Sequence, residues 1–585
     1  MMIMGINAYH GDASAVLMHN GSLIAAVEEE RFQRVKHWAG FPHESIRYCL
    51  DVAGISAREI DVFALSRQPG AHRLRKAAFV LRHRPSLSLL RARQRHGRRV
   101  CDVAREIAAA LGLERHHISR RLRWVEHHQA HLASAYVVSP FDQAAVCTLD
   151  GFGDFVSTSM AIGRGSTCNV LKRIYFPHSI GLLYLAITQY LGFPVYGEEY
   201  KVMGLAAYAT PDYVAALRPL IQLRPGGGFA LDLSYFRHWS AGDGMSWGAG
   251  EPSLDRVYTP KLEERLGPAR LPGAPLDERH MAIAASLQQV FEATVFHVLR
   301  ALHRRTHLPQ LCLAGGCALN SVMNGKIRTQ TPFTDVYIQP AAADNGTALG
   351  AALHVWHHLG GQPRRFVMAD AFWGPQFHDD DLRVLLSLRS SELQPFILRK
   401  VDDAAELCRW TSLRLARGNV IGWFQGRMEW GARALGNRSI LADPRRADMR
   451  QLINAKIKGR ESFRPFGASI LEEALDEYFV GAAADAFMTQ VYPVRPDKRE
   501  VIPAVTHIDG SGRLQTVSRQ PGFLYRQLLE TFAQLTGVPV LLNTSFNAHE
   551  PIVHKPAEAL DCFLHTQMDG LVLGHYTLEK PLTSH

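Results

Sequence analysis

The sequence has few features of extracellular, membrane-spanning or zinc-ribbon proteins. Its eight cysteines are scattered over 585 residues and no two are spaced as Cys-x-x-Cys, so neither a disulfide framework nor a zinc ribbon is predicted. No apolar run reaches the ~18 residues needed to span a bilayer. The N-terminus begins with a strand-like run, MMIMGINAY, rather than a basic leader. We therefore expect a cytoplasmic protein.

The composition is that of an ordinary globular protein. Hydrophobic residues make up 47% of the chain and charged residues 21%, and the length allows at least two domains with their own cores. The formal net charge of +10 admits anionic small molecules, nucleic acid or a membrane surface as partners.

Four separated residues form a candidate metal-ligand set. His127 and His131 are four residues apart in an apolar-periodic segment, so on a helix their imidazoles project from one face. Asp150 ends a strand-like run and opens a glycine-containing turn, and Asp344 follows a second strand-like run. Two imidazoles and two carboxylates suit a divalent first-row metal, which leaves iron, manganese and zinc open.

The histidine pair alone is a weak signal, because a chain with 28 histidines contains such pairs by chance. The alternative is that these are surface or core histidines of a helix. His128, three residues before His131, is a competing ligand.

Two hairpin patterns indicate an internal duplication. Strand-like residues 3–9 and 13–17 flank a turn at 10–12, and residues 23–27 form a further strand after Asn-Gly. Residues 148–162 repeat this pattern of strand, Asp-Gly turn and strand. Such a duplication is typical of the actin/hexokinase/Hsp70 type of fold, which holds nucleotide phosphates between two lobes.

Alternating helices and strands then predict parallel strand pairs. The segments are a helix at 280–304 capped by Asp277, strands at 311–314 and 335–339, and a helix at 347–359. Gly315 and Gly316 precede a helix that begins at Asn320, and backbone N–H groups at such a turn form an anion site.

Turn residues cluster at 360–363, so we expect domains at 1–360 and 361–585. The second domain has four stretches rich in Arg, Lys, Gly, Asn and Ser, which start at Gln425, Lys458, His507 and Asn543. Guanidinium and ammonium groups with hydrogen-bonding side chains suit phosphate and nucleotide. The alternative is that these arginines pair with surface acids, but four such stretches favour an anionic-substrate site.

Residues 67–99 contain eleven Lys or Arg residues and no acid. Phe79 is the only Phe, Tyr or Trp there, which disfavours single-stranded nucleic acid because that ligand needs stacking platforms. A solvated helical face and a contact with an anionic or large acceptor remain the two interpretations.

Together these stretches resemble the O-carbamoyltransferase family, which includes the nodulation, cephamycin and tobramycin carbamoyltransferases. The resemblance covers nearly the whole chain. It rests on the ordered motifs GINAYHGDASA, EEERFQRVKH, EHHQAH, LDGFGD, YGEEYKVMGLA, LAGGCALN, AAADNGTALGAA, QGRMEWGARALGNRSILADPR, KGRESFRPF, HIDGSGRLQTV and LLNTSFN.

The resemblance implies an α/β chain with an N-terminal domain similar to the tRNA threonylcarbamoyl transferase, of the actin-like class, and a C-terminal YrdC-like domain. The C-terminal domain would make carbamoyl-adenylate from carbamoyl phosphate and Mg²⁺-ATP. The N-terminal domain would transfer the carbamoyl group to a hydroxyl of a small-molecule acceptor in secondary-metabolite tailoring, and AMP would leave. No membrane or nucleic-acid partner is expected, and a homodimer is predicted.

The resemblance also implies residue roles. A metal, iron in the best-studied relatives, would be held by His127, His131, Asp150 and Asp344. His10 is assigned as general base, because imidazole titrates near neutrality, with Lys36 orienting the acceptor or the carbamoyl group. Carbamoyl-adenylate would be bound by Asp12, Gly151, Gly315, Gly316 and Asn320. ATP and carbamoyl phosphate would be bound by Arg433, Lys458, Arg464, Arg513, Asn543 and Ser545.

Three other functions compete. A tRNA threonylcarbamoyl transferase would not need a fused activating domain, and a hydrogenase-maturation carbamoyltransferase would carry paired Cys-x-x-Cys motifs that this sequence lacks. A non-catalytic nucleotide-binding regulator would have no reason to keep both the metal set and the basic set.

Overall fold

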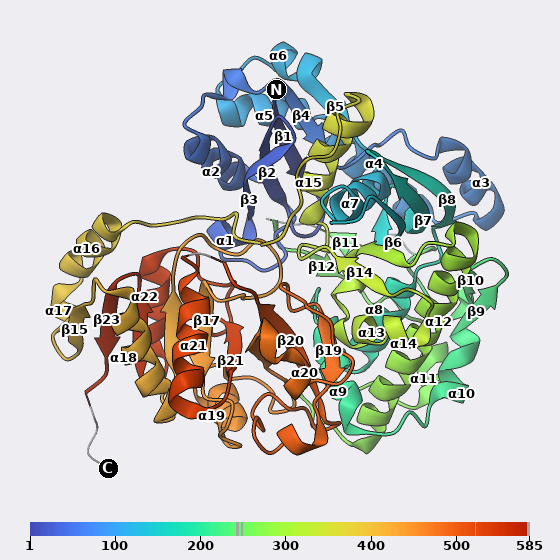
Figure 1. The fold of residues 1–585 in the computed structure, drawn as a ribbon. Helices are drawn as coiled ribbons and strands as arrows, with labels where there is room; N and C mark the ends of the chain where they lie inside the picture. The colour runs from blue at the N-terminus through green and yellow to red at the C-terminus, as the bar shows by residue number, and fades with distance from the viewer. Residues whose placement is uncertain (241–244, 247–249, 521, 582–585) are drawn as a thin grey trace. The chain divides into compact units, whose positions relative to one another are not determined.

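The computed structural model describes residues 1–240, 245–246, 250–520 and 522–581 (Figure 1). These residues form two compact units. Unit 1 comprises Met1–Asn320 and Lys326–Met368, and unit 2 comprises Ser321–Gly325 and Ala369–His585. The sequence-based boundary was placed after residue 360.

Unit 1 contains two five-stranded mixed sheets with the same topology. Their orders are β3-β2-β1-β4-β5 and β8-β7-β6-β13-β14. In each sheet three antiparallel strands are followed by two parallel additions. The first sheet consists of β1 Met2–Asn7, β2 Ser14–His19, β3 Ser22–Glu28, β4 Val62–Leu65 and β5 Leu122–Trp124; the second consists of β6 Gln143–Gly153, β7 Val156–Arg164, β8 Thr167–Tyr175, β13 Gln310–Ala314 and β14 Asp335–Ile338. The predicted internal duplication is confirmed.

The two halves of unit 1 meet through equivalent helices. Helix α7 (His127–Tyr136) follows β5, and helix α15 (Gly346–Leu353) follows β14. They pack against each other, so closely that a Cβ added to Gly350 would lie 1.7 Å from the carbonyl oxygen of Ala130. Only glycine allows this approach of two helices, and the contact sets the position of α7.

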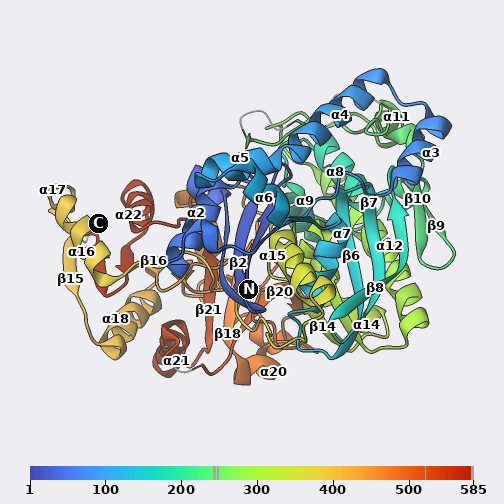
Figure 2. The same ribbon diagram turned by 90° about the horizontal axis from the view of Figure 1, so that it is seen from above.

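Helix α12 (Glu278–Thr306) begins at the predicted cap. The side chain of Asp277 accepts a hydrogen bond from the backbone N–H of His280. In return, Nδ1 of His280 accepts one from the backbone N–H of Asp277. The helix is long and apolar enough to cross a membrane, but 83% of its most apolar window is buried inside the protein. It packs on α8 (Ile180–Tyr190) and on strands β6 and β7 of the second sheet, which are labelled in Figure 2.

Two local predictions differ from the structure. Asp150 does not end its strand, because β6 continues to Gly153 with irregular pairing between Leu149 and Gly153. The Asp-Gly pair lies in this bulge, which keeps the chain extended, and the reversal occurs at Asp154 and Phe155, both with positive φ. The helix predicted to start at Asn320 is the short α13, Ser321–Gly325.

Unit 2 is built on a nine-stranded mixed sheet of order β15-β23-β22-β16-β17-β21-β18-β20-β19. The strands are β15 Ile397–Lys400, β16 Ile421–Phe424, β17 Arg438–Ala442, β18 Gly467–Leu471, β19 Gln490–Pro493, β20 Ser511–Val517, β21 Val540–Ser545, β22 Gly570–Leu573 and β23 Tyr576–Glu579. The stretch that starts at Gln425 directly follows β16, and the stretch that starts at Asn543 begins within β21.

Both faces of this sheet are covered by helices. Ile421 and Trp423 point into a core with α18 (Ala404–Ala416) and α21 (Leu524–Thr536), whereas Val420 and Phe424 point into a second core. The second core includes residues of α16 (Asp379–Leu388), α19 (Met449–Lys456) and α22 (Pro556–His565). Figure 2 shows α22 on one side of the sheet and α18 and α21 on the other. Unit 2 is thus a three-layer α/β structure.

Candidate functional site

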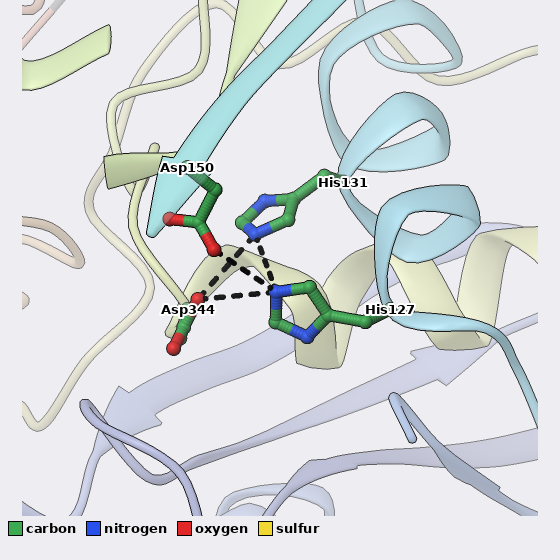
Figure 3. A group of neighbouring side chains, drawn as sticks. All are labelled: His127, His131, Asp150 and Asp344. Carbon is green, nitrogen blue, oxygen red and sulfur yellow. Dashed lines mark hydrogen bonds and ion pairs between the residues drawn. The ribbon is translucent and has the colours of Figure 1, made fainter. Parts of the chain in front are cut away.

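The four predicted metal ligands converge in unit 1 (Figure 3). Nε2 of His127 lies 3.4 Å from Oδ2 of Asp150 and 3.4 Å from Oδ1 of Asp344. Nε2 of His131 lies 3.4 Å from the same Asp344 oxygen and 3.1 Å from Nε2 of His127. All four side chains are buried. Two residues from one helix, one from a strand and one from a loop therefore direct their donor atoms at one point.

Local contacts fix the helix that carries the imidazoles. Glu126 caps α7 by accepting from the backbone N–H of Gln129, and Asp154 accepts from the backbone N–H of His127 at 3.0 Å. A Cβ on Gly153 would lie 1.9 Å from the His127 ring. The ring therefore occupies space that only glycine leaves open.

The charges of this group stabilise one another. Burial lowers the pKa of His127, but Asp344 and Asp150 overcome it and raise that pKa to about 10. Burial and Asp344 raise the pKa of Asp150, yet His127 and His131 bring it down to about 2. Burial likewise opposes ionisation of Asp344, but His10 and His127 hold its pKa well below the usual range. Both carboxylates are ionised at neutral pH.

The donor set fits a divalent cation. Oδ1 of Asp344 is buried, lies 3.4 Å from both Nε2 atoms, and receives no hydrogen bond from any residue that the structure describes. A buried carboxylate oxygen without a donor is costly, and a cation among the four donors would remove that cost. One donor atom from each residue lies within 4.8 Å of all the others, a span that a single ion can bridge.

The competing histidine is engaged elsewhere. His128 contacts the hydroxyl of Thr148 through Nδ1 at 2.7 Å and the carbonyl of Val156 through Nε2 at 3.0 Å. Burial lowers the pKa of His128 to about 3. A neutral ring that accepts from Thr148 and donates to Val156 satisfies both contacts, so His128 is not available as a ligand.

The other N-terminal predictions lie around the first hairpin. His10 contacts Asp344 through Nδ1 and the carbonyl of Phe152 through Nε2 at 3.0 Å, so the structure brings it to the edge of the ligand group. Both of these partners are acceptors. Asp12, with a left-handed backbone, contacts Nδ1 of His37 at 2.7 Å, and Lys36 is exposed.

The glycine turn lies beside Asp150. The backbone N–H of Gly316 donates to Oδ1 of Asp150 at 3.0 Å, and a Cβ on Gly315 would lie 2.3 Å from the carbonyl oxygen of Leu149. Space is open above Gly151. Asn320 is buried, and its side-chain amide exchanges two hydrogen bonds of 3.0 Å with the amide of Gln288.

In unit 2 two of the predicted basic residues, Arg433 and Arg513, form a like-charge cluster with Arg460, which was not predicted. Burial together with the charges of Arg433 and Arg460 lowers the pKa of Arg513 well below its ordinary range. Guanidinium groups that repel one another in this way are stabilised by an anion between them. Such a cluster is suited to an anion, and the phosphate-binding role of Arg433 and Arg513 stays a prediction.

The remaining predicted residues of unit 2 are held by hydrogen bonds within it. The buried ammonium of Lys458 donates to the carbonyls of Ser545 at 2.5 Å and Asn547 at 2.7 Å. Nδ2 of Asn543 donates to the carbonyl of Ala434 at 3.2 Å. Lys458 and Asn543 therefore order the loops that carry the predicted site. Arg464 pairs with Glu461 at 2.9 Å.

Comparison with known proteins identifies the family. Residues 2–353 match the model described as "Carbamoyltransferase N-terminus", and residues 412–580 match "Carbamoyltransferase C-terminus". The chain belongs to the carbamoyltransferase family. It is therefore a transferase, as the resemblance predicted.

Two relatives of this carbamoyltransferase are similar over almost all of the chain. "Uncharacterized protein sll1178" of Synechocystis is 40% identical over 99% of this chain and 96% of that protein. "Nodulation protein NolNO" of Sinorhizobium fredii is 39% identical over 99% of this chain and 80% of that protein. Among solved structures, T. kodakarensis HypF has a TM-score of 0.30 and 16% identity, covering 62% of this chain and 48% of that chain. A likeness of that size bears on neither fold nor function.

In this carbamoyltransferase, His37 and Tyr196 were not predicted as site residues from the sequence. Burial lowers the pKa of His37, but Asp12, Glu30 and Glu199 together raise it to about 9, so the ring is a cation at neutral pH. Tyr196 lies edge-on to His37, and its hydroxyl lies against Gly11, where a Cβ would be 2.6 Å away. Both residues stand in quoted motifs, but only the fold brings them beside Asp12.

The roles of Glu429 and Arg438 in holding the loop at residues 429–438 were also not predicted from the sequence. One carboxylate oxygen of Glu429 accepts from the backbone N–H groups of Leu435, Asn437 and Arg438, at 2.8 to 3.1 Å. The guanidinium of Arg438 donates to backbone carbonyls, including that of Pro375 at 3.0 Å, and lies over the Phe424 ring. Arg438 is therefore structural, while Arg433 lies in the loop that Glu429 holds.

Proposed function

We propose that this chain is an ATP-dependent O-carbamoyltransferase that works in two steps. Unit 2, as a YrdC-like domain, forms carbamoyl-adenylate. Unit 1, as an actin-type domain, transfers the carbamoyl group to a hydroxyl of a small-molecule acceptor, in the tailoring of a secondary metabolite. The observation that carries the proposal is the like-charge cluster around Arg513, in a chain of this family.

In the activation step, one carbamoyl phosphate, one ATP and one water give carbamoyl-adenylate, phosphate and pyrophosphate. The substrates carry several negative charges, and Mg²⁺ accompanies the ATP. Arg433, Arg460 and Arg513 would bind the phosphates, because an anion among them relieves their mutual repulsion. Lys458 would keep the loop at Ser545 in place for this binding.

In the transfer step, the acceptor hydroxyl attacks the carbamoyl carbon, the bond from that carbon to the phosphate oxygen of AMP breaks, and AMP leaves. A divalent ion held by His127, His131, Asp150 and Asp344 would act as a Lewis acid toward the phosphate or carbonyl oxygen. Iron is our first choice of metal, with zinc and manganese as alternatives. The burial of the four side chains and the ionised state of both carboxylates support this role, and a bound ion would displace the proton of His127.

The chain's own residues divide the remaining work of transfer. His10, at the edge of the ligand group, is proposed to take the proton of the acceptor hydroxyl, which requires its contact with Asp344 or Phe152 to open when substrates bind. The imidazolium of His37, paired with Asp12, would face the negative charge of the adenylate. The glycine turn at Gly315 and Gly316 is proposed to line the adenylate site, while the N–H of Gly316 holds Asp150 in place.

The test needs no acceptor. Purified protein is incubated with Mg²⁺-ATP, with and without carbamoyl phosphate, and pyrophosphate is followed over time. We compare the wild type with Lys458→Met and with the control Lys456→Met, which changes an exposed lysine two residues away. Pyrophosphate release that depends on carbamoyl phosphate is expected in the wild type and the control. It should fall by about 100-fold in Lys458→Met.

A folded wild-type protein that releases no pyrophosphate with carbamoyl phosphate present would overturn the carbamoyl-adenylate mechanism. Thermal unfolding of each variant shows whether a loss of activity comes from the site or from the fold. If Lys458→Met unfolds at a lower temperature, the wild-type result alone decides.

A further inference from the structure

Residues 67–99, the basic segment of unit 1, form an exposed helical surface with an apolar stripe. Helix α3 spans Arg73–His83 and helix α4 spans Leu87–Cys101. Leu74 is 87% exposed and Leu81 is 78% exposed. With the exposed Ala78 they occupy positions i, i+4 and i+7 of α3, so they share one face. Leu87, 69% exposed, follows at the start of α4.

Arginines border this stripe on both sides. At about 100° per residue, Arg75 and Arg82 lie along one side of the leucines and Arg73 lies along the other. All three are exposed, and residues 67–99 contain eleven Lys or Arg residues and no acid. The surface is therefore apolar along its centre and cationic along its margins.

The opposite face of α3 is anchored to the body of unit 1. Phe79 is buried and packs edge-on against Phe155 and Phe176, with ring centroids 5.8 and 4.9 Å apart. The guanidinium of Arg93, on α4, lies 5.6 Å from the centre of the Phe176 ring. Because the inward face is packed in this way, the leucines are held outward. Helix α3 lies at the outer edge of unit 1 in both ribbon views (Figures 1 and 2).

We propose that α3 and the start of α4 form a docking surface for an anionic phospholipid bilayer. Outward leucines with flanking arginines are the composition of helices that lie in the membrane interface. The leucines would enter the boundary between headgroups and acyl chains, while the arginines would meet lipid phosphates. This peripheral contact replaces the expectation of no membrane partner and requires no spanning helix.

Charge complementarity and the leucines together favour a bilayer over nucleic acid. Nucleic acid would use the arginines but would leave the leucines in water. The one Phe of the segment, Phe79, is buried and offers no stacking platform. A membrane uses both parts of the surface.

The experiment is co-sedimentation of the full chain with vesicles of phosphatidylcholine, with and without phosphatidylserine. The variants are Leu74→Ser/Leu81→Ser and Arg73→Ser/Arg75→Ser/Arg82→Ser. The control is Leu388→Ser, which removes a leucine of unit 2 that is 78% exposed on the acid-rich helix α16. We expect binding that needs phosphatidylserine, and about a tenfold loss of vesicle affinity in the leucine variant and more in the arginine variant. The control should bind as the wild type does.

Three outcomes would overturn the proposal. The first is failure of the wild type to sediment with anionic vesicles. The second is equal binding by the wild type and the leucine variant, which would show a purely electrostatic contact. The third is arginine-dependent binding to a single-stranded RNA oligonucleotide without vesicle binding. Because every changed residue is exposed, unchanged thermal unfolding is expected and confirms that the fold is intact.

Discussion

In unit 1 two carboxylates converge with two imidazoles, whereas in unit 2 the positive charges of Arg433 and Arg460 repel that of Arg513. The pKa values show the difference. Asp150 is brought to about 2 and His127 is raised to about 10, because opposite charges meet in a buried space. The pKa of Arg513 is instead lowered by burial and by like charges. Opposite charges therefore meet in the first group, and like charges meet in the second.

This contrast shows how each group can bind. The unit 1 group has a buried carboxylate oxygen directed at its centre and is suited to a cation, whereas an anion bound in the unit 2 group would reduce the repulsion between its guanidinium groups. A chain that uses both would keep its metal chemistry and its phosphate chemistry in separate units. Variants of each group should therefore have separable effects.

The largest expected effect is on metal binding. His127→Ala removes one of four donors and should weaken metal affinity by more than about 100-fold, because changes to outer-shell residues alone cost 10- to 100-fold. Elemental analysis of the purified protein measures the bound metal. The exposed His116→Ala serves as control. Pyrophosphate release by unit 2 should stay within about twofold of wild type, and a parallel loss of both properties would contradict the separation.

Arg513→Met makes the converse test. Carbamoyl-phosphate-dependent pyrophosphate release should fall by about 100-fold, while bound metal is unchanged. Because the substitution removes a repelled guanidinium, the unfolding temperature should stay equal or rise. Arg519→Met, which changes an arginine whose side chain is 81% exposed, is the control. A destabilised but active Arg513→Met protein would argue against an anion site.

Gly350→Ala tests how α7 is positioned. The new methyl group would meet the carbonyl of Ala130, so the variant should lose roughly 3 kcal/mol of unfolding free energy and bind less metal. Urea unfolding and elemental analysis measure the two effects. Gly97→Ala, in α4 with open space around it, should be neutral or slightly stabilising. Unchanged stability in Gly350→Ala would mean that the helices can separate at little cost.

The smallest expected effect is the pH dependence of stability that Asp485 causes. The pKa of Asp485 is raised, whereas that of Asp150 is lowered. Burial raises its pKa from 3.8 to about 6, despite hydrogen bonds from the backbone N–H groups of Phe487 and Thr489. Between these values the unfolded chain loses its proton first, so this group destabilises the folded protein increasingly as pH rises from about 4 to 6. Between pH 4.5 and pH 7 this cost grows by about 2 kcal/mol.

The measurement is urea unfolding at pH 4.5 and pH 7 for the wild type and Asp485→Asn. The variant should gain stability relative to the wild type on going to pH 7, while the exposed Asp497→Asn should show no such change. A constant difference between wild type and Asp485→Asn would show that the aspartate titrates normally.

The local signals of the sequence carried much of the fold. Asp277 marked the start of α12, and the two hairpins indicated the duplication that the sheet orders confirm. The spacing of His127 and His131 was enough to place both on one helix face. These features depend on residues close together in the chain, where capping, turns and periodicity act.

Features that depend on contacts between distant residues could not be predicted from the sequence. The nine-strand order of unit 2 and the assignment of Ser321–Gly325 to that unit follow from packing between distant segments. His37 became a candidate only when the fold brought it to Asp12 and Glu199. The sequence predicted a turn after Asp150 because Asp-Gly is a common turn signal, but in the structure β6 continues through a bulge there.

The duplication also determines the order of events during synthesis. Each half of unit 1 holds only part of the ligand group: His127 and His131 come from the first half, and Asp150 and Asp344 from the second. A nascent chain therefore displays its imidazoles well before Asp344 has left the ribosome. The four side chains come together only after Asp344 has emerged and the second half has folded against the first, so a metal ion bound by all four would enter after that step.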